Sequence, residues 1–173
     1  MFFVSAQFNY NVFRNELRHF SRMTKKVTDS SKKNVIIMGR LTYFGIPESK
    51  RPLLDRYNIV LTSEPEKYKF PADVSVCKSM NEALKKIQQP DLASTIENVW
   101  IVGGNSVYQE AMNSDKCHRI YFTKIMAKFD CDAFFPKITD QFQRVSNDED
   151  LTEEIQEENG IKYQYQIFEK LKA

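Results

Sequence analysis

Glu16 is a carboxylate beside an apolar stripe, a position from which an acid can do chemistry. Phe13, Leu17 and Phe20 share one face of a predicted helix. Glu16 falls next to them, because residues 13, 16, 17 and 20 follow the i, i+3, i+4, i+7 spacing of an amphipathic helix. Such a residue is either a surface group at the margin of the stripe or a buried functional acid. A buried carboxylate needs a cationic or hydrogen-bond-donating partner. The spacing leaves both alternatives open.

Two strand-to-helix junctions offer groups that can bind phosphate. The first follows the apolar run 34–38. There Gly39 permits a tight turn, Arg40 suits a phosphate monoester and Thr42 offers a hydroxyl. In a parallel sheet such junctions meet at one edge, where N–H groups at helix N-termini bind anions. An ordinary turn also accounts for these residues.

The second junction is the Gly103-Gly104 pair after the apolar run 99–102. Two residues without Cβ atoms permit close approach of a ligand, and Asn105 or Ser106 can cap the next helix. The pair is neither a G-x-G-x-x-G fingerprint nor followed by a Walker lysine, which argues against a kinase-type phosphate loop. A simple turn remains the alternative. The residues alone indicate a nucleotide-binding α/β domain with an acid on its first helix.

Strand-like and helix-like segments alternate through the first two thirds of the chain. Continuous apolar runs predict strands at 34–38, 57–61, 74–77 and 99–102. Helical patterns lie at 12–23, 79–88 and 106–112. Ser79 followed by Glu82 has the spacing of a capping box. This alternation predicts βαβ units and a parallel sheet covered by helices.

The C-terminal third has a different pattern. Residues 120–126 are strand-like, and residues 161–169 alternate apolar and polar with period two. We expect the last strand to lie antiparallel at an edge of the sheet, with one face in solvent. The acidic stretch 147–160 between them predicts a surface loop or the tip of a hairpin.

Composition restricts the class of protein. The 173 residues fit a single domain, 1–173, and 42% hydrophobic residues supply a core. The 25 basic and 23 acidic residues leave a net charge of +2, which does not indicate a nucleic-acid partner. Three cysteines without a CxxC pair and two histidines predict no metal site and a reducing, cytoplasmic location. No apolar run reaches the 18 residues of a membrane span.

Several long blocks in order resemble dihydrofolate reductase of the animal type. The blocks are FRNELRHFSRMT (13–24), NVIIMGRLTYFGIPESKRPLLDRYNIVLT (34–62), VWIVGGNSVYQEAM (99–112), HRIYFTKIMAKFDCDAFFP (118–136) and QEENGIKYQYQIFEK (156–170). The resemblance implies an eight-stranded, mostly parallel mixed sheet with an antiparallel C-terminal strand and about four helices. It also implies NADPH-dependent reduction of 7,8-dihydrofolate to tetrahydrofolate by a monomer that binds dihydrofolate and antifolates and needs neither membrane nor nucleic acid.

The resemblance also assigns roles at the substrate end. Glu16 matches the acid that holds the pterin 2-amino and N3 groups, and Thr123 matches its hydroxyl partner. Arg56 matches the arginine that pairs with the substrate's glutamate carboxylate. The residues expected to bind substrate are Leu17, Phe20, Ile46, Arg56 and Val102.

At the cofactor end, the resemblance implies a cis peptide between Gly103 and Gly104. Val102 and Tyr108 are expected against substrate and nicotinamide. Leu41 and Ser63 stand where the family usually has basic residues, which weakens the expected recognition of the 2'-phosphate. The residues expected to bind the cofactor are Gly39, Arg40, Thr42, Thr62, Ser63, Gly103, Gly104, Asn105, Ser106, Val107 and Tyr108.

The segment before residue 12 departs from the family pattern, because the glycine-containing mobile loop and the Leu-Pro-Trp motif are absent. In one register, residues 2–6 form the first strand and the loop is cut short. In the other, an ungapped count puts Tyr10 at the tryptophan position, as a catalytic candidate, and the central strand is missing. We favour the first register, because a missing central strand exposes two ladders of N–H and C=O groups. A short loop leaves reduced activity, or a non-catalytic folate- or NADPH-binding protein, as the alternative function.

Overall fold

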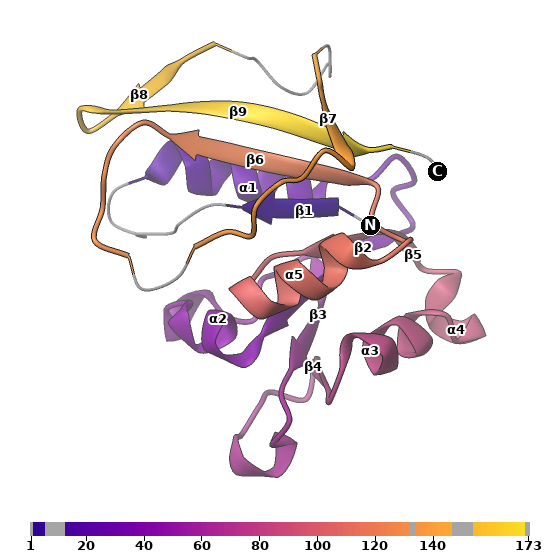
Figure 1. The fold of residues 1–173 in the computed structure, drawn as a ribbon. Coiled ribbons are helices and arrows are strands. Elements are labelled where there is room, and N and C mark those ends of the chain that lie inside the picture. Colours follow the sequence, from indigo (N-terminus) through magenta and orange to yellow (C-terminus); the bar gives the residue numbers. More distant parts are fainter. Residues whose placement is uncertain (1, 6–12, 132–133, 147–153, 172–173) are drawn as a thin grey trace.

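A nine-stranded mixed sheet is the framework of the residues that the structure describes (Figure 1). The computed structural model describes residues 2–5, 13–131, 134–146 and 154–171. The strands are β1 (Phe2–Ser5), β2 (Lys33–Gly39), β3 (Arg56–Leu61), β4 (Val74–Cys77), β5 (Ile96–Ile101), β6 (Arg119–Ile125), β7 (Phe142–Val145), β8 (Gln156–Glu158) and β9 (Ile161–Lys170). The helices are α1 (Arg14–Lys25), α2 (Arg40–Gly45), α3 (Met80–Ile87), α4 (Pro90–Ala93) and α5 (Asn105–Asn113), with 3-10 turns η1 (Glu48–Lys50) and η2 (Pro65–Lys67).

The first strand of the chain lies in the centre of this sheet. The strand order is β4-β3-β2-β5-β1-β6-β9-β7, and β8 also pairs with β9. β1 runs parallel to both neighbours, with Phe2 opposite Trp100 of β5 and opposite Arg119 of β6. The interpretation of the N-terminus as a strand is therefore confirmed for residues 2–5, and the register without a central strand is wrong.

The predicted fold class, a mostly parallel mixed sheet of the dihydrofolate reductase type with helices on its faces, is confirmed. β1 to β6 pair in parallel, and β9 runs antiparallel to β6. The described residues form nine strands and five α-helices, rather than eight and about four. The additional elements are short: β8 has three residues and α4 has four.

The prediction that the last strand lies at an edge is wrong. β9 pairs with β6 on one side and with β7 and β8 on the other. Its inward-facing residues include Tyr163, Tyr165 and Ile167, as the period-two pattern indicates, but Gln166 is buried as well. Periodicity distinguishes the two faces of a strand and carries no information about its hydrogen-bonded neighbours. β7 and β8 are so short and polar that the sequence pattern does not predict them as strands.

Helices cover both faces of the sheet, and β2 shows how its residues divide between them. Val35 and Ile37 pack in a cluster with α3 and α5, whereas Ile36 and Met38 pack in a second cluster with α1 and α2. All four side chains are fully buried. In Figure 1, α1 lies behind the sheet and α5 in front of it. Each such side chain contributes about 1.5–3 kcal/mol on burial, which explains the continuous apolar run.

Two helix boundaries show which side-chain contacts define the helix ends. α1 runs over Arg14–Lys25, two residues later than the predicted 12–23. At its C-terminal end the buried Asn34 amide donates to the carbonyls of Thr24 and Lys26 at 2.9 and 2.8 Å. α3 begins with the predicted capping residue: the Ser79 hydroxyl accepts from the Glu82 N–H at 3.1 Å.

A tight hairpin joins β8 to β9. Asn159 and Gly160 both have positive φ, 51° and 76°, as a two-residue turn between antiparallel strands requires. The predicted hairpin tip is therefore confirmed for residues 156–160, while residues 147–153 lie outside the described part of the chain. The turn places Glu158 at the end of β8, close to the start of α1.

Candidate active site

Glu16 is a buried acid. It is the third residue of α1, only 2% of it is exposed, and its Oε1 accepts a hydrogen bond from the Thr123 hydroxyl of β6 at 3.1 Å. Its Oε2 is buried and has no hydrogen-bond partner among the described residues. The alternative of a surface residue is therefore wrong. A buried oxygen without a partner costs free energy unless a ligand donates to it.

Burial changes the acid–base behaviour of this carboxyl. Desolvation raises the pKa of Glu16 from 4.5 to about 7; the Thr123 hydrogen bond opposes this, and the negative charge of Glu158 adds to it. The neighbouring phenols remain protonated, because burial raises the pKa of Tyr108, Tyr163 and Tyr165 as well. Glu16 can therefore gain or lose a proton near neutral pH.

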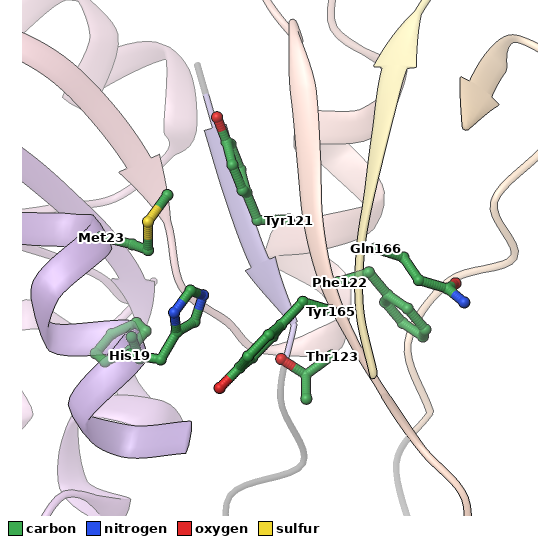
Figure 2. A pocket seen from close by; sticks show the side chains of 8 residues that line it. His19, Met23, Tyr121, Phe122, Thr123, Tyr165 and Gln166 are labelled. Atoms are coloured by element: carbon green, nitrogen blue, oxygen red, sulfur yellow. The ribbon is translucent and has the colours of Figure 1, made fainter. Parts of the chain in front are cut away.

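A small cavity lies against the inner surface of α1 beside Thr123 (Figure 2). Its volume is about 10 Å³, which is room for about one water molecule. His19 and Met23 reach it from α1, and His19 stacks on Tyr165 of β9 with ring centroids 4.0 Å apart. Figure 2 shows Tyr121, Thr123 and Tyr165 on the side of the sheet that faces α1. Thr123 is thus oriented toward the helix that carries Glu16.

Three of the residues predicted to bind substrate share one apolar cluster. Phe20 of α1, Ile46 after α2 and Val102 after β5 are buried together. They come from three separate elements, so the sheet and both helices are needed to assemble this apolar wall. Leu17 is half-buried and is not a member of the cluster.

Arg56 is held rigidly at the start of β3. Only 8% of it is exposed; its Nη1 donates to the Thr24 hydroxyl at 2.6 Å and its Nε to the Leu54 carbonyl at 3.0 Å. Burial lowers the pKa of the guanidinium to about 10, which still leaves it charged at neutral pH. The two hydrogen bonds fix the plane of the guanidinium, so a carboxylate has one preferred direction of approach.

An open groove of about 1220 Å³ crosses the edge of the sheet where β2, β3 and β4 end. It contains nine of the eleven residues predicted to bind the cofactor: Gly39, Arg40, Thr42, Thr62, Ser63, Gly104, Asn105, Ser106 and Val107. Gly103 and Tyr108 do not line it; Tyr108 is a buried residue of α5 and packs on Phe135 with ring centroids 4.9 Å apart. The structure thus brings both strand-to-helix junctions to one groove.

At the Gly103-Gly104 corner, the backbone conformation and the neighbouring Thr42 side chain favour a glycine at position 103. The peptide between them is cis, as expected, and Gly103 has φ +119°. A Cβ added to Gly103 would lie 3.0 Å from the Thr42 hydroxyl, and one added to Gly39 would lie 3.3 Å from Val107. The Gly39 N–H also donates to the Gly103 carbonyl at 2.7 Å. This cradle lets a ligand approach the backbone closely.

The groove also contains residues that the sequence pattern did not identify as functional. Lys78 and Ser79 line it directly after β4, and Arg40 lies over the Tyr68 ring at 4.5 Å from its centroid. Lys78 directly follows β4, just as Thr62 directly follows β3. Because parallel strands end at the same edge of a sheet, this position could have identified Lys78 as a groove residue from the sequence. Asn105 acts differently from expectation, because its side-chain amide donates to the Phe134 carbonyl at 2.6 Å.

The charge of Glu16 acts on α5, the helix that follows the glycine corner. Tyr108, four residues after Gly104, is near enough to Glu16 for the carboxylate charge to contribute to its raised pKa. Tyr10, the remaining catalytic candidate, lies outside the described residues. Within the described ranges, no three His, Cys, Asp or Glu side chains gather as metal ligands, and no helix has the length and apolarity needed to cross a membrane.

Comparisons with known proteins agree with this geometry. The protein-family model described as dihydrofolate reductase matches residues 11–170. The chain is 64% identical over 158 residues to dihydrofolate reductase of Aedes albopictus, covering 91% of this chain and 85% of that protein. It is 46% identical over 160 residues to the enzyme of Rattus norvegicus, covering 92% and 85%. The solved structure of Schistosoma mansoni dihydrofolate reductase is similar with a TM-score of 0.86 at 29% identity, covering 98% of both chains. With these matches beside the buried acid and the glycine corner, the chain belongs to the dihydrofolate reductase family.

Proposed function

We propose that this protein reduces 7,8-dihydrofolate to tetrahydrofolate with NADPH, and that Glu16 and Thr123 bind the pterin end of the substrate. Dihydrofolate reduction and a nicotinamide cofactor follow from membership of the family. The roles of individual residues are the proposal. It depends on one observation above all: Glu16 Oε2 is buried and has no hydrogen-bond partner in the described part of the chain, while Oε1 accepts from the Thr123 hydroxyl.

A pterin ring supplies the donors that this carboxylate lacks. Its 2-amino group and N3–H project side by side, and a carboxylate presents two acceptor oxygens in the matching geometry. Thr123 already donates to Oε1, which orients the carboxylate in its plane. The apolar cluster that contains Phe20 and Val102 provides a surface for the flat ring. Hydrogen bonds in so dry a site are stronger than in water.

Arg56 suits the other end of the substrate. The glutamate tail of dihydrofolate carries carboxylates, and a rigid, charged guanidinium at the edge of an apolar wall recognises a carboxylate. The contacts to Thr24 and Leu54 hold the guanidinium before substrate arrives, so little side-chain entropy is lost on binding.

The groove fits a dinucleotide with a phosphorylated ribose. Backbone N–H groups at the start of α5 and the side-chain-free glycine corner suit a pyrophosphate. Arg40, Lys78, Thr62 and Ser63 offer cations and hydroxyls at the ends of β2, β3 and β4, which favours NADPH over NADH. When bound, the cofactor supplies the hydride that reduces C6 of the substrate, while N5 gains one proton.

The raised pKa of Glu16 lets the carboxyl be charged or neutral near neutral pH. Because the pKa of Glu16 is about 7, the carboxyl holds a proton in part of the population at neutral pH and accepts hydrogen bonds in the rest. In its charged form it polarises the pterin, and N5 takes its proton from an ordered water. The wall around Glu16 excludes bulk solvent from the carboxyl.

Two features support a monomeric protein in a reducing compartment. Cys77, Cys117 and Cys131 are all free thiols, and the first two are buried. Unpaired cysteines are usual in the cytoplasm. The acid, the apolar cluster around Phe20 and the groove are all formed by residues of one chain, so the proposed site needs no second copy.

The direct test is the loss of NADPH absorbance on addition of 7,8-dihydrofolate. We expect turnover by the wild-type protein and a loss of about 10²- to 10⁴-fold in kcat for Glu16→Gln, which cannot carry the charge. Glu66→Gln, at an exposed position in η2, should behave as wild type. A folded wild-type protein without turnover would rule out the enzyme, and an unimpaired Glu16→Gln would rule out the assigned acid.

A further inference from the structure

Helix α1 has no cap of its own. The residue before it is Phe13, whose side chain cannot accept a hydrogen bond. The cap comes instead from Glu158, at the end of β8: the Arg14 N–H donates to Glu158 Oε1 at 2.8 Å. The Asn15 N–H donates to both carboxylate oxygens, at 3.2 Å to Oε1 and 2.9 Å to Oε2. A carboxylate from more than 140 residues away thus satisfies the first two amides of the helix.

This contact fixes the start of α1 to the β8–β9 hairpin. First-turn amides lack partners within a helix, and the helix dipole attracts negative charge to that end. The Asn159-Gly160 turn defines where Glu158 lies. An apolar contact reinforces the polar one, because Phe13 packs edge to face on Tyr163 of β9 with ring centroids 5.9 Å apart.

Glu16 is itself an acid of this first turn. An acid at the third helical position is attracted to unpaired amides at the start of its own helix, as in a capping box. Glu158 already accepts from two of those amides. The Glu16 carboxylate points instead to Thr123 and keeps Oε2 without a partner among the described residues.

We propose that Glu158 is a positioning residue for Glu16: by capping α1 from the β8–β9 hairpin, it keeps the acid turned into the site instead of toward its own helix end. The inference rests on the proposed function of Glu16 as the pterin-binding acid. Glu158 does not touch the substrate in this scheme; it acts through the helix.

The charge of Glu158 has a second consequence for Glu16. Among the described residues, the titratable groups around Glu16 are Tyr108 from α5, Tyr163 and Tyr165 from β9, Glu158 from β8 and, stacked on Tyr165, His19 from α1 itself. The phenols remain neutral, because burial raises their pKa. Glu158 is the charged neighbour that contributes to the raised pKa of Glu16, so neutralising it should lower that pKa below about 7.

The test compares Glu158→Gln, Glu158→Ala and, as a matched control, Glu157→Gln. Glu157 is the adjacent carboxylate on the same strand and is exposed. The first readout is the pH titration of the Glu16 carboxyl carbon by ¹³C NMR in the ligand-free protein, assigned with Glu16→Gln. The second is the pH profile of kcat and kcat/KM for dihydrofolate. The first readout needs no turnover, so it separates failure of this inference from failure of the proposed function.

We expect Glu158→Gln, which keeps one acceptor oxygen for the helix, to shift the Glu16 titration and the kcat profile to lower pH. Glu158→Ala should lower kcat/KM further, by at least about tenfold, because the acid turns away from the site. Glu157→Gln should match wild type in both readouts. An unchanged Glu16 titration in Glu158→Gln would overturn the proposal. So would a folded Glu158→Ala protein with lower thermal stability and wild-type kcat/KM.

Discussion

At the scale of single residues, burial of the Glu16 carboxylate destabilises the folded protein at alkaline pH and provides an acid for the reaction. The pKa of Glu16 is raised from 4.5 to about 7 in the folded protein, so the folded state holds the proton more tightly than the unfolded chain. The resulting contribution to stability is complete below pH 4.5 and is lost as the pH rises through about 7. The difference between 4.5 and about 7 corresponds to roughly 3 kcal/mol at most at high pH, to the order of magnitude.

Glu16→Gln should therefore stabilise the protein at alkaline pH while it abolishes most activity. We expect the free energy of unfolding to rise by about 1–3 kcal/mol relative to wild type at pH 8, and the gain to disappear near pH 4.5. Urea denaturation at the two pH values measures this difference. If Glu16→Gln raised the free energy of unfolding equally at pH 8 and at pH 4.5, the destabilising effect of Glu16 would not come from its charge.

Gly103 is the second residue at which function constrains the chain. Its φ of +119° is rarely adopted by residues with a side chain, and an added Cβ would lie 3.0 Å from the Thr42 hydroxyl. Gly103→Ala should cost about 1–3 kcal/mol of stability and raise the KM for NADPH. Chemical denaturation and steady-state kinetics measure the two effects. Gly45→Ala is the control, because a Cβ there meets nothing within 4 Å; a similar loss in both variants would contradict a specific role of the corner.

At the scale of elements, a buried polar chain links α1 to three strands. The Asn34 side chain of β2 donates to the Thr24 carbonyl and accepts from the Asn98 N–H of β5 at 3.0 Å. The Thr24 hydroxyl donates to the Phe20 carbonyl at 2.8 Å, so it meets Arg56 of β3 as an acceptor. The orientation of Arg56 thus depends on where the end of α1 lies.

Thr24→Val should disturb Arg56 and leave the chemistry at Glu16 intact. Valine keeps the shape of threonine and removes the acceptor, so we expect the KM for dihydrofolate to rise about tenfold with little change in kcat. A dihydropterin without the glutamate tail should be reduced equally well by both proteins. Thr24→Ser keeps the hydroxyl and should retain the wild-type KM. If Thr24→Val also raised the KM for the dihydropterin without the tail, the substitution would have damaged the site in general and not Arg56 alone.

The same scale shows how far the sequence could predict the structure. The run 34–38 was readable as a strand because Val35 and Ile36 are buried on opposite faces, and burial on both faces leaves a continuous apolar pattern. Ser79 was readable because a cap is a local interaction. The contact between Glu158 and the start of α1 could not be predicted, because it joins residues far apart in the sequence and leaves no local pattern around Arg14 or Glu158. The internal position of β9 was missed for the same reason.

At the scale of the whole molecule, the sheet depends on its first strand. β1 bridges β5 and β6, and both neighbours expose unpaired ladder groups when it is absent. Deleting residues 1–5 should abolish cooperative unfolding, because the domain has only about 5–15 kcal/mol of stability to lose. Circular dichroism melts would show this, and amide exchange of wild type should show residues 2–5 as protected as β5. A deletion variant with a wild-type melting curve would contradict the pairing.

The central position of β1 also determines when the sheet can form during translation. Its partners on either side, residues 96–101 and 119–125, are translated about a hundred residues after it. At ribosomal rates of about 5–20 residues per second, roughly 6–24 seconds pass between synthesis of the N-terminal segment and synthesis of both complete partner strands. During that interval the nascent chain cannot complete its sheet, and its apolar segments are exposed to solvent. Chaperone engagement should therefore last until residue 125 has left the ribosomal tunnel, and a slow codon run before that point should lower the yield of active protein.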